Sequence, residues 1–248
     1  MKKWLILLLI AAVAALPSCA QGAAAQPEPA VVFADALLEE RVRTALGKPD
    51  GDITVAEAQT LTALDLSNAD WDAMNALGGG IRDLGGLENF TNLTELCLDF
   101  NDIRDFSPLA GLTKLQTLTF CGVRPDDLSP LSGLTAMVTL RFNWSYAPDQ
   151  GFYGWESLGF MENMKELEVF EARNAGIRDI SALAGLPKLW SVFIEENLIT
   201  DISPLADVRT LREFLIAGNP IEDYSCLEPV REVFPALYPD FQPDVALN

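Results

Sequence analysis

Apolar residues recur along most of this chain with a period of 22 residues. Leu93, Leu115 and Met137 are separated by this interval, and a second run of equally spaced apolar residues follows from Leu167 to Leu211. Within one unit the positions that recur are those of Leu93, Leu96, Leu98, Asn101, Ile103, Phe106, Leu109 and Leu112. A unit this short cannot bury its own apolar face, so the pattern predicts a stack of about seven similar units with one continuous core.

Each unit contains a short strand signal followed by a turn signal. Leu96 and Leu98 are two positions apart, which places both side chains on one face of a strand and Cys97 on the other. We expect each strand to pair in parallel with the equivalent strand of the next unit. Asn101 is expected to turn the chain by satisfying backbone groups with its side-chain amide.

The second half of each unit predicts a short return segment on the other side of the stack. Prolines mark this segment at Pro108, Pro130 and Pro204. Aspartates that hold one phase of the repeat are interpreted as turn or cap residues and not as a row of metal ligands. They are Asp105, Asp127, Asp179, Asp201 and Asp223.

Two intervals between units are longer than the period, by ten and eight residues. The apolar pattern resumes at Ile81 and again at Trp155, so the extra residues lie at 70–80 and 146–154. Both insertions follow directly after a predicted strand, and they are therefore expected to emerge at the same rim, roughly 14 Å apart. Trp155 takes an apolar position of the repeat and is interpreted as a core residue.

The N-terminus carries an export signal. Lys2 and Lys3 precede an apolar run that is too short for a membrane span. The run ends in Leu16-Pro17-Ser18-Cys19, which resembles the lipobox of bacterial lipoproteins and implies lipid modification of Cys19. Cleavage after Ala20 is the alternative, because small residues stand at the positions that it requires. We expect an extracytoplasmic protein that is lipid-anchored to a bacterial membrane.

These signals divide the chain into five segments. An amphipathic helix is expected from Ala34 to Gly47, with Leu37, Leu38, Val42 and Leu46 on one face. The predicted segments are a signal peptide at 1–18, a lipid-anchored linker at 19–31, an N-terminal helical cap at 32–60, the repeat solenoid at 61–232 with its two insertions, and a C-terminal cap at 233–248.

The repeat matches the L-x-x-L-x-L-x-x-N-x-I pattern of leucine-rich repeats. The stretch GKPDGDITVAEAQTLTALDLS and the phrase DISPLA resemble bacterial internalin-type leucine-rich-repeat proteins, over about Val32 to Leu237. The resemblance implies an α/β fold, a right-handed solenoid with a parallel β-sheet on its concave face and a helical cap at the N-terminal end. The turn asparagine is missing at Ala69, Val123, Ser145 and Ala175, and those turns are expected to be looser.

Composition narrows the possible functions. The chain has 17 basic and 36 acidic residues, a net charge of −19 and no histidine. Histidine catalysis and histidine-ligated metal sites are excluded, and such an acidic surface repels nucleic acid. The acidity either keeps an exported protein soluble or matches a cationic partner. No phosphate-binding loop or paired catalytic carboxylates are found, so we expect no enzyme activity, no cofactor and no metal.

The resemblance implies that ligands bind the concave sheet. Arg141 and Arg173 are expected to face Glu171 and Glu195 as an exposed charge ladder. The insertions add aromatic side chains, which either bind a ligand or fold back on the solenoid as a lid. The candidate ligand-binding residues are Trp71, Thr119, Arg141, Asn143, Trp144, Tyr146, Phe152, Tyr153, Arg173 and Phe193. The expected function is a monomeric cell-surface binding module for a protein, peptide or glycan, which touches the membrane only through its lipid.

The cysteines offer a second hypothesis, a thiol-based redox or metal site at Cys97 and Cys121. The predicted register places their Cα atoms roughly 8 Å apart, beyond the separation at which a disulfide forms without backbone movement. We therefore expect the two thiols to be close and unbridged. Cys226 falls in the phase of the convex side, far from both.

Overall fold

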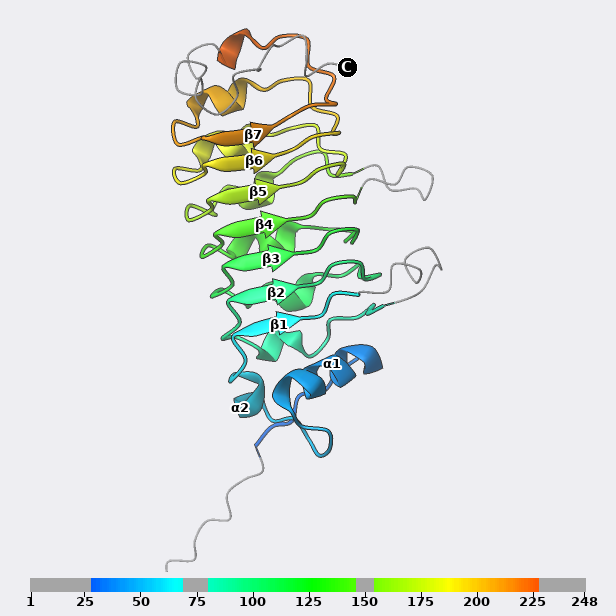
Figure 1. Ribbon diagram of the computed structural model, residues 1–248. Helices are drawn as coiled ribbons and strands as arrows, with labels where there is room; N and C mark the ends of the chain where they lie inside the picture. The colour runs from blue at the N-terminus through cyan, green and yellow to red at the C-terminus, as the bar shows by residue number, and fades with distance from the viewer. Residues whose placement is uncertain (1–27, 69–79, 146–153, 228–248) are drawn as a thin grey trace, which may run out of the picture.

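The computed structural model describes residues 28–68, 80–145 and 154–227. In these ranges the chain forms one stack of seven short strands that are paired in chain order in a single parallel sheet (Figure 1). The strands are β1 (Ala63–Asp65), β2 (Glu95–Cys97), β3 (Thr117–Thr119), β4 (Thr139–Arg141), β5 (Val169–Glu171), β6 (Ser191–Phe193) and β7 (Glu213–Leu215). Equivalent positions of neighbouring units pair, so the predicted register is confirmed: Cys97 is opposite Thr119, and Thr119 is opposite Arg141.

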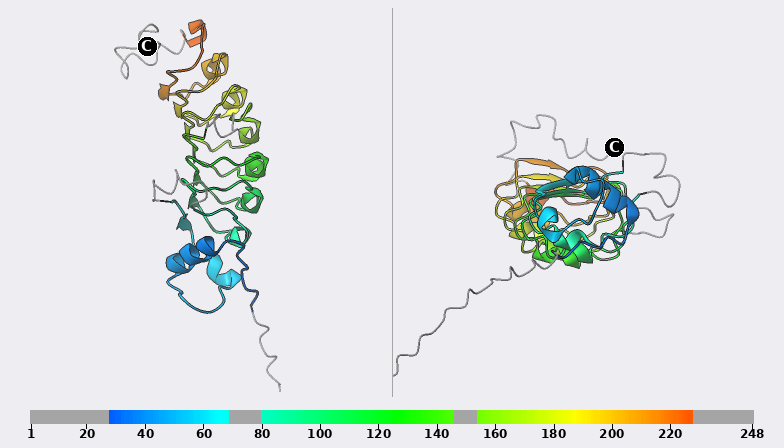
Figure 2. Two further views of the ribbon diagram at one scale, coloured as in Figure 1. Left: turned by 90° about the vertical axis from the view of Figure 1, so that its right-hand side faces the viewer. Right: turned by 90° about the horizontal axis from the view of Figure 1, so that it is seen from below.

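Short 3-10 helices form the side of the stack opposite the sheet, as Figure 2 shows. They are η1 (Leu87–Asn89), η2 (Ser107–Leu109), η3 (Ser129–Gly133), η5 (Gly159–Met161), η6 (Ser181–Gly185), η7 (Ser203–Asp207) and η8 (Ser225–Leu227). The predicted prolines lie in the first turns of η2, η3 and η7. The aspartates in phase act as turn residues, because each accepts a hydrogen bond of 2.8 Å from the backbone N–H two residues later.

The core lies between the sheet and the 3-10 helices. Its centre is a run of aromatic rings, in which Phe120 stacks on Phe142 with centroids 5.0 Å apart. Trp155 packs edge-on against Phe142 at 5.3 Å, which confirms its interpretation as a core residue. Because Phe120 and Phe142 come from consecutive units, each unit contributes to the burial of its neighbours and the stack is stabilised as a whole.

Buried asparagines close the turns after the strands. The Asn197 side-chain amide donates to the carbonyls of Ala172 and Ile194 at 2.7 and 2.9 Å, and its oxygen accepts from two backbone N–H groups of the preceding unit. Three of the turns that lack this residue are as closely packed as the others, contrary to expectation, because Val123, Ser145 and Ala175 are fully buried. Ala69 lies outside the described residues. One reason is that the amide of a neighbouring unit compensates: Asn197 Oδ1 accepts from the Ala175 N–H at 3.0 Å.

Two helices cover the N-terminal end of the stack: α1 (Ala36–Leu46) and α2 (Val55–Ala58) (Figure 1). Helix α1 begins two residues later than predicted, because Asp35 caps its N-terminus and accepts hydrogen bonds from the Leu37 and Leu38 N–H groups. Asp35 also accepts from the Arg82 N–H at 2.9 Å, which ties the cap to the repeats. Leu38 and Val42 are fully buried, so the amphipathic face predicted for this helix packs on the core.

Several sequence predictions concern residues outside the described ranges. They include the signal peptide with Cys19, most of the linker, nearly all of both insertions and the C-terminal cap. Within the described ranges, none of the helices combines the length and the apolar character that crossing a bilayer requires.

Candidate binding surface

The outward side of the sheet, which we call the sheet face, carries one side chain per unit in each of three parallel rows. The middle row contains Cys97, Thr119, Arg141, Glu171 and Phe193, aligned by the strand register. A further row follows directly after the strands, where backbone hydrogen bonds between neighbouring units continue the ladder. The candidate ligand-binding residues on the strands, Thr119, Arg141 and Phe193, therefore lie in one row on one surface, with Glu171 between Arg141 and Phe193.

Two ion pairs cross the sheet face between neighbouring units. Arg141 Nε lies 3.0 Å from Glu171 Oε1, and Arg173 Nε lies 3.0 Å from Glu195 Oε2. The Arg173 guanidinium also lies 4.9 Å from the centre of the Phe193 ring. Exposed pairs of this kind stabilise the fold by only a few tenths of a kcal/mol. Their main effect is to orient two arginines that remain partly exposed, at 44% and 35% of the side chain.

Asn143 is not an exposed residue of the sheet face, so that prediction is wrong. Its side chain is buried and its Oδ1 accepts from the Arg173 N–H of the next unit at 2.7 Å. Asp99 makes the same contact to the Cys121 N–H, also at 2.7 Å. A short side chain with an acceptor oxygen, such as Asn143 or Asp99, reaches the backbone N–H of the next unit. That oxygen is then occupied and is not available to a ligand.

The rim beyond the strands holds an aromatic pair, Phe100 and Trp144, which we call the rim pair. Their rings stack with centroids 6.4 Å apart and an interplanar angle of 14°. Gly122 lies between them in the intervening unit, and a Cβ atom there would come within 2.8 Å of the Phe100 ring. The absence of a side chain at Gly122 therefore allows Phe100 to reach across a whole unit towards Trp144.

The rim pair occupies a left-handed turn position of the repeat. Phe100 and Trp144 have φ angles of 61° and 60°. Gly122, Asn174, Glu196 and Gly218 hold the same position of their units with φ between 49° and 76°, so this conformation belongs to the repeat turn. Trp144 is also 49% exposed. Trp144 is one of the candidates predicted from the sequence, and Phe100 is not, although Phe100 stands two periods earlier in the same phase with a glycine between them.

The thiols do not have the properties of a redox or metal site. Cys97 and Cys121 are free, as predicted, and Cys226 lies in η8. Burial, with a smaller effect from the Asp99 carboxylate, raises the pKa of Cys121 to about 12, and burial also raises the pKa of Cys97. Because the thiolate is the reactive form, both cysteines are weak nucleophiles and weak ligands at neutral pH. Among the described residues, no His, Cys, Asp or Glu side chains gather in a group able to hold a metal ion.

The remaining candidates, Trp71, Tyr146, Phe152 and Tyr153, lie outside the described residues. The last described residues before the two insertions are Asn68 and Ser145, which follow the ends of β1 and β4 in the turn after each strand. Trp144 therefore stands at the base of the second insertion.

Comparison with known proteins identifies the fold. No protein-family model matches the sequence, and no curated protein matches it in a sequence search. Among solved structures, internalin C2 of Listeria monocytogenes is 28% identical with a TM-score of 0.60, over 82% of this chain and 93% of that one. Internalin F of the same organism is 27% identical with a TM-score of 0.59, over 80% of this chain. The match spans 62% of the internalin F chain. The protein therefore has the leucine-rich-repeat fold of the internalins.

Proposed function

We propose that this protein is a bacterial surface module that captures a protein ligand on its sheet face and the adjoining rim. The observation that carries the proposal is the rim pair, in which a large, exposed tryptophan is fixed by stacking at the edge of the sheet face. Trp144 is 49% exposed and is not among the buried core residues, so its fixed ring is available to a partner.

The chemistry of the surface supports a polypeptide ligand. Tryptophan and arginine are the residues that most often dominate the energetics of protein interfaces. Trp144 at the rim and Arg141 and Arg173 on the sheet face place such groups over one continuous surface. The two arginines are held by Glu171 and Glu195, so they lose little conformational freedom on binding.

Membrane attachment belongs to the same proposal. A lipid on Cys19 would hold the cap end of the stack near the bilayer, with the linker between them, and leave the sheet face open to the surroundings. Catalysis and cofactor binding are not part of the proposal, since the described part of the sheet face carries ion pairs and two cysteines whose pKa is raised by burial.

The experiment is capture by the immobilised mature protein from extracts of bacterial and host cell surfaces, followed by identification of the bound material. Trp144→Ala is expected to weaken capture about fivefold or more with an unchanged melting temperature, since a contributing contact is worth at least about 1 kcal/mol. Trp190→Ala is the matched control. This half-buried tryptophan lies before β6, at the other end of the strand.

Two outcomes would contradict the proposal. If Trp144→Ala lowers the melting temperature while the ligand captured per folded molecule is unchanged, the rim pair serves packing alone. If capture survives protease treatment of the extract and is abolished by periodate oxidation, the ligand is a glycan and not a protein.

A further inference from the structure

The two arginines of the sheet face are more exposed than the glutamates that pair with them. In the Arg141–Glu171 pair the side chains are 44% and 16% exposed, and in the Arg173–Glu195 pair they are 35% and 19% exposed. The glutamates are therefore the covered members of both pairs, and the guanidinium groups form the outer surface. A molecule that approaches this part of the sheet face meets two cations first.

Both ion pairs use only one of the three nitrogens of the arginine. The closest contact runs from Nε to a single carboxylate oxygen, at 3.0 Å in each pair. This contact is a hydrogen bond for Arg173, whereas the buried Nε of Arg141 is not aligned for one. Within the described part of the chain, Nη1 and Nη2 of these two arginines make no hydrogen bond. The terminal donors with which arginine binds a carboxylate are therefore left for a partner.

The Arg173 side chain is held in this orientation by its surroundings. Its backbone N–H donates to Asn143 Oδ1 at 2.7 Å, and its guanidinium carbon lies 4.9 Å from the centre of the Phe193 ring. Together with the contact to Glu195, these interactions fix both ends of the residue. Such an arginine loses little conformational freedom when it binds a ligand.

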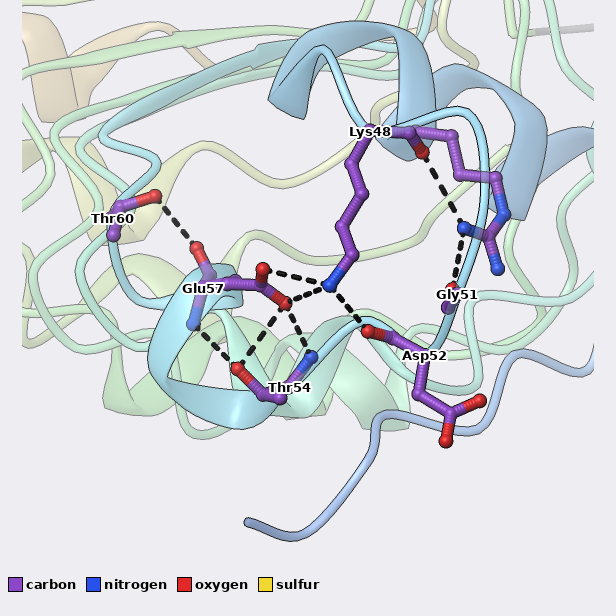
Figure 3. A network of polar contacts seen from close by, with 7 residues as sticks. Lys48, Gly51, Asp52, Thr54, Glu57 and Thr60 are labelled. Atoms are coloured by element: carbon purple, nitrogen blue, oxygen red, sulfur yellow. Dashed lines mark hydrogen bonds and ion pairs between the residues drawn. The ribbon is translucent and has the colours of Figure 1, made fainter. Parts of the chain in front are cut away.

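The cations of the N-terminal cap show the opposite arrangement. Lys48 Nζ donates to both carboxylate oxygens of Glu57 at 2.7 Å and to the Asp52 carbonyl (Figure 3). Arg43 donates through Nε and Nη2 to Glu39 and through Nη1 to a loop carbonyl. The donors of these two side chains are engaged within the fold, which distinguishes them from the terminal donors of the sheet-face arginines.

The spacing of the two arginines suits an extended polypeptide. Arg173 lies one strand across from Arg141 and two residues along, so their Cα atoms are about 8 Å apart. Side chains two residues apart in an extended chain point to the same side with a rise of about 6.6 Å. Two carboxylates at such positions can therefore reach one guanidinium each. The net charge of −19 repels a polyanion, which favours a segment that is acidic only locally.

We propose that the sheet face binds an extended polypeptide segment with two carboxylate side chains two residues apart, one on the terminal nitrogens of Arg141 and one on those of Arg173. This inference rests on the proposed function, because it names the chemistry of the ligand captured there. Glu171 and Glu195 support the two cations from beneath and compete with the carboxylates of the ligand.

The test uses a synthetic peptide of alternating glutamate and valine as the probe, and copies with glutamine or lysine in place of glutamate. Binding to the full mature protein is measured by fluorescence anisotropy. The glutamate peptide should bind at least about fivefold more tightly than the glutamine peptide, since charge-assisted bonds to arginine are lost in the latter. The lysine peptide should bind more weakly than both.

Paired substitutions separate the local cation from the net charge. Arg141→Gln combined with Glu171→Gln leaves the net charge unchanged and should weaken binding of the glutamate peptide at least about fivefold. Glu171→Gln alone should bind this peptide more tightly than wild type, because the competing carboxylate is removed. Arg209→Gln is the control, since this exposed arginine lies between η7 and β7, outside the sheet face.

The inference is overturned if the glutamine or lysine peptide binds as tightly as the glutamate peptide, or if the folded paired variant binds like wild type. If that variant does not fold, Arg173→Gln combined with Glu195→Gln decides by the same measurement. Tighter binding of oligogalacturonate than of the glutamate peptide would identify an acidic glycan and overturn the polypeptide. Capture from surface extracts that depends on Trp144 and not on the arginines would overturn this inference while the proposed function stands.

Discussion

The indole of Trp144 stacks on the ring of Phe100 although the two residues belong to units that are not neighbours. The centroids are 6.4 Å apart, and the intervening unit contributes Gly122 at the same position. All three residues have a φ between 60° and 72°, so the turn has one backbone conformation in the three units. The side chain at this position therefore differs from unit to unit while the backbone conformation is kept.

Gly122→Ala should destabilise the protein by about 1–3 kcal/mol and separate the rim pair. The new Cβ atom would come within 2.8 Å of the Phe100 ring, and φ at this position is 72°. The measurement is the free energy of unfolding in urea. Gly111→Ala is the control, because a Cβ atom at this position would face open space and its φ is not in the left-handed region. Equal stability of the two variants would mean that Gly122 is not needed for the stack.

The sequence predicted the repeat, the strands and the turn aspartates because each depends on residues within a single unit. Asn143 was misassigned because its burial depends on a contact to Arg173 in the next unit. Phe100 was missed because its role depends on the glycine between two units, and periodicity describes what the units share. Side chains that differ between units, which make up the candidate site, are set by contacts that a repeat pattern does not contain.

Asn197→Ala should lower the free energy of unfolding by about 3 kcal/mol or more. Its amide donates to the carbonyls of Ala172 and Ile194, and the substitution would leave these buried groups without their partner. Urea denaturation measures the change. Asn163→Ala, at an exposed position after η5, should change stability by less than about 0.5 kcal/mol. If both variants unfold at the same urea concentration, the amide does not hold neighbouring units together.

Lipidation of Cys19 is predicted to retain the protein in the membrane fraction. Mass spectrometry of the native protein should find a diacylglycerol-modified cysteine at the N-terminus of the mature chain. Cys19→Ser should release the protein from the membrane fraction, because the lipid is its expected anchor. A mature chain that begins with an unmodified Gln21 would instead identify ordinary cleavage after Ala20.

Cys97 and Cys121 should react with a thiol reagent only slowly in the native protein and fully after denaturation, without prior reduction. Burial raises the pKa of both thiols, so little thiolate is present at neutral pH. Alkylation followed by mass spectrometry measures the rates. Cys97→Ser and Cys121→Ser should leave ligand capture unchanged. A disulfide between the two cysteines in the native protein would show that the strand register differs from the one observed.

Acid should destabilise the protein through the turn aspartates. Hydrogen bonds from the serine two residues later hold the pKa of Asp127, Asp201 and Asp223 below its usual value. A carboxyl group with a lowered pKa in the folded state contributes stability above its unfolded pKa of about 3.9, and this contribution is lost as the pH falls through the lower folded value. Replacing the three aspartates by asparagine should therefore reduce the loss of stability below about pH 4, measured as the urea midpoint against pH. The substitution keeps an acceptor oxygen in each turn, so the fold should be retained at neutral pH. If the urea midpoint of the triple variant falls as steeply below about pH 4 as that of wild type, other carboxyl groups are responsible for acid unfolding.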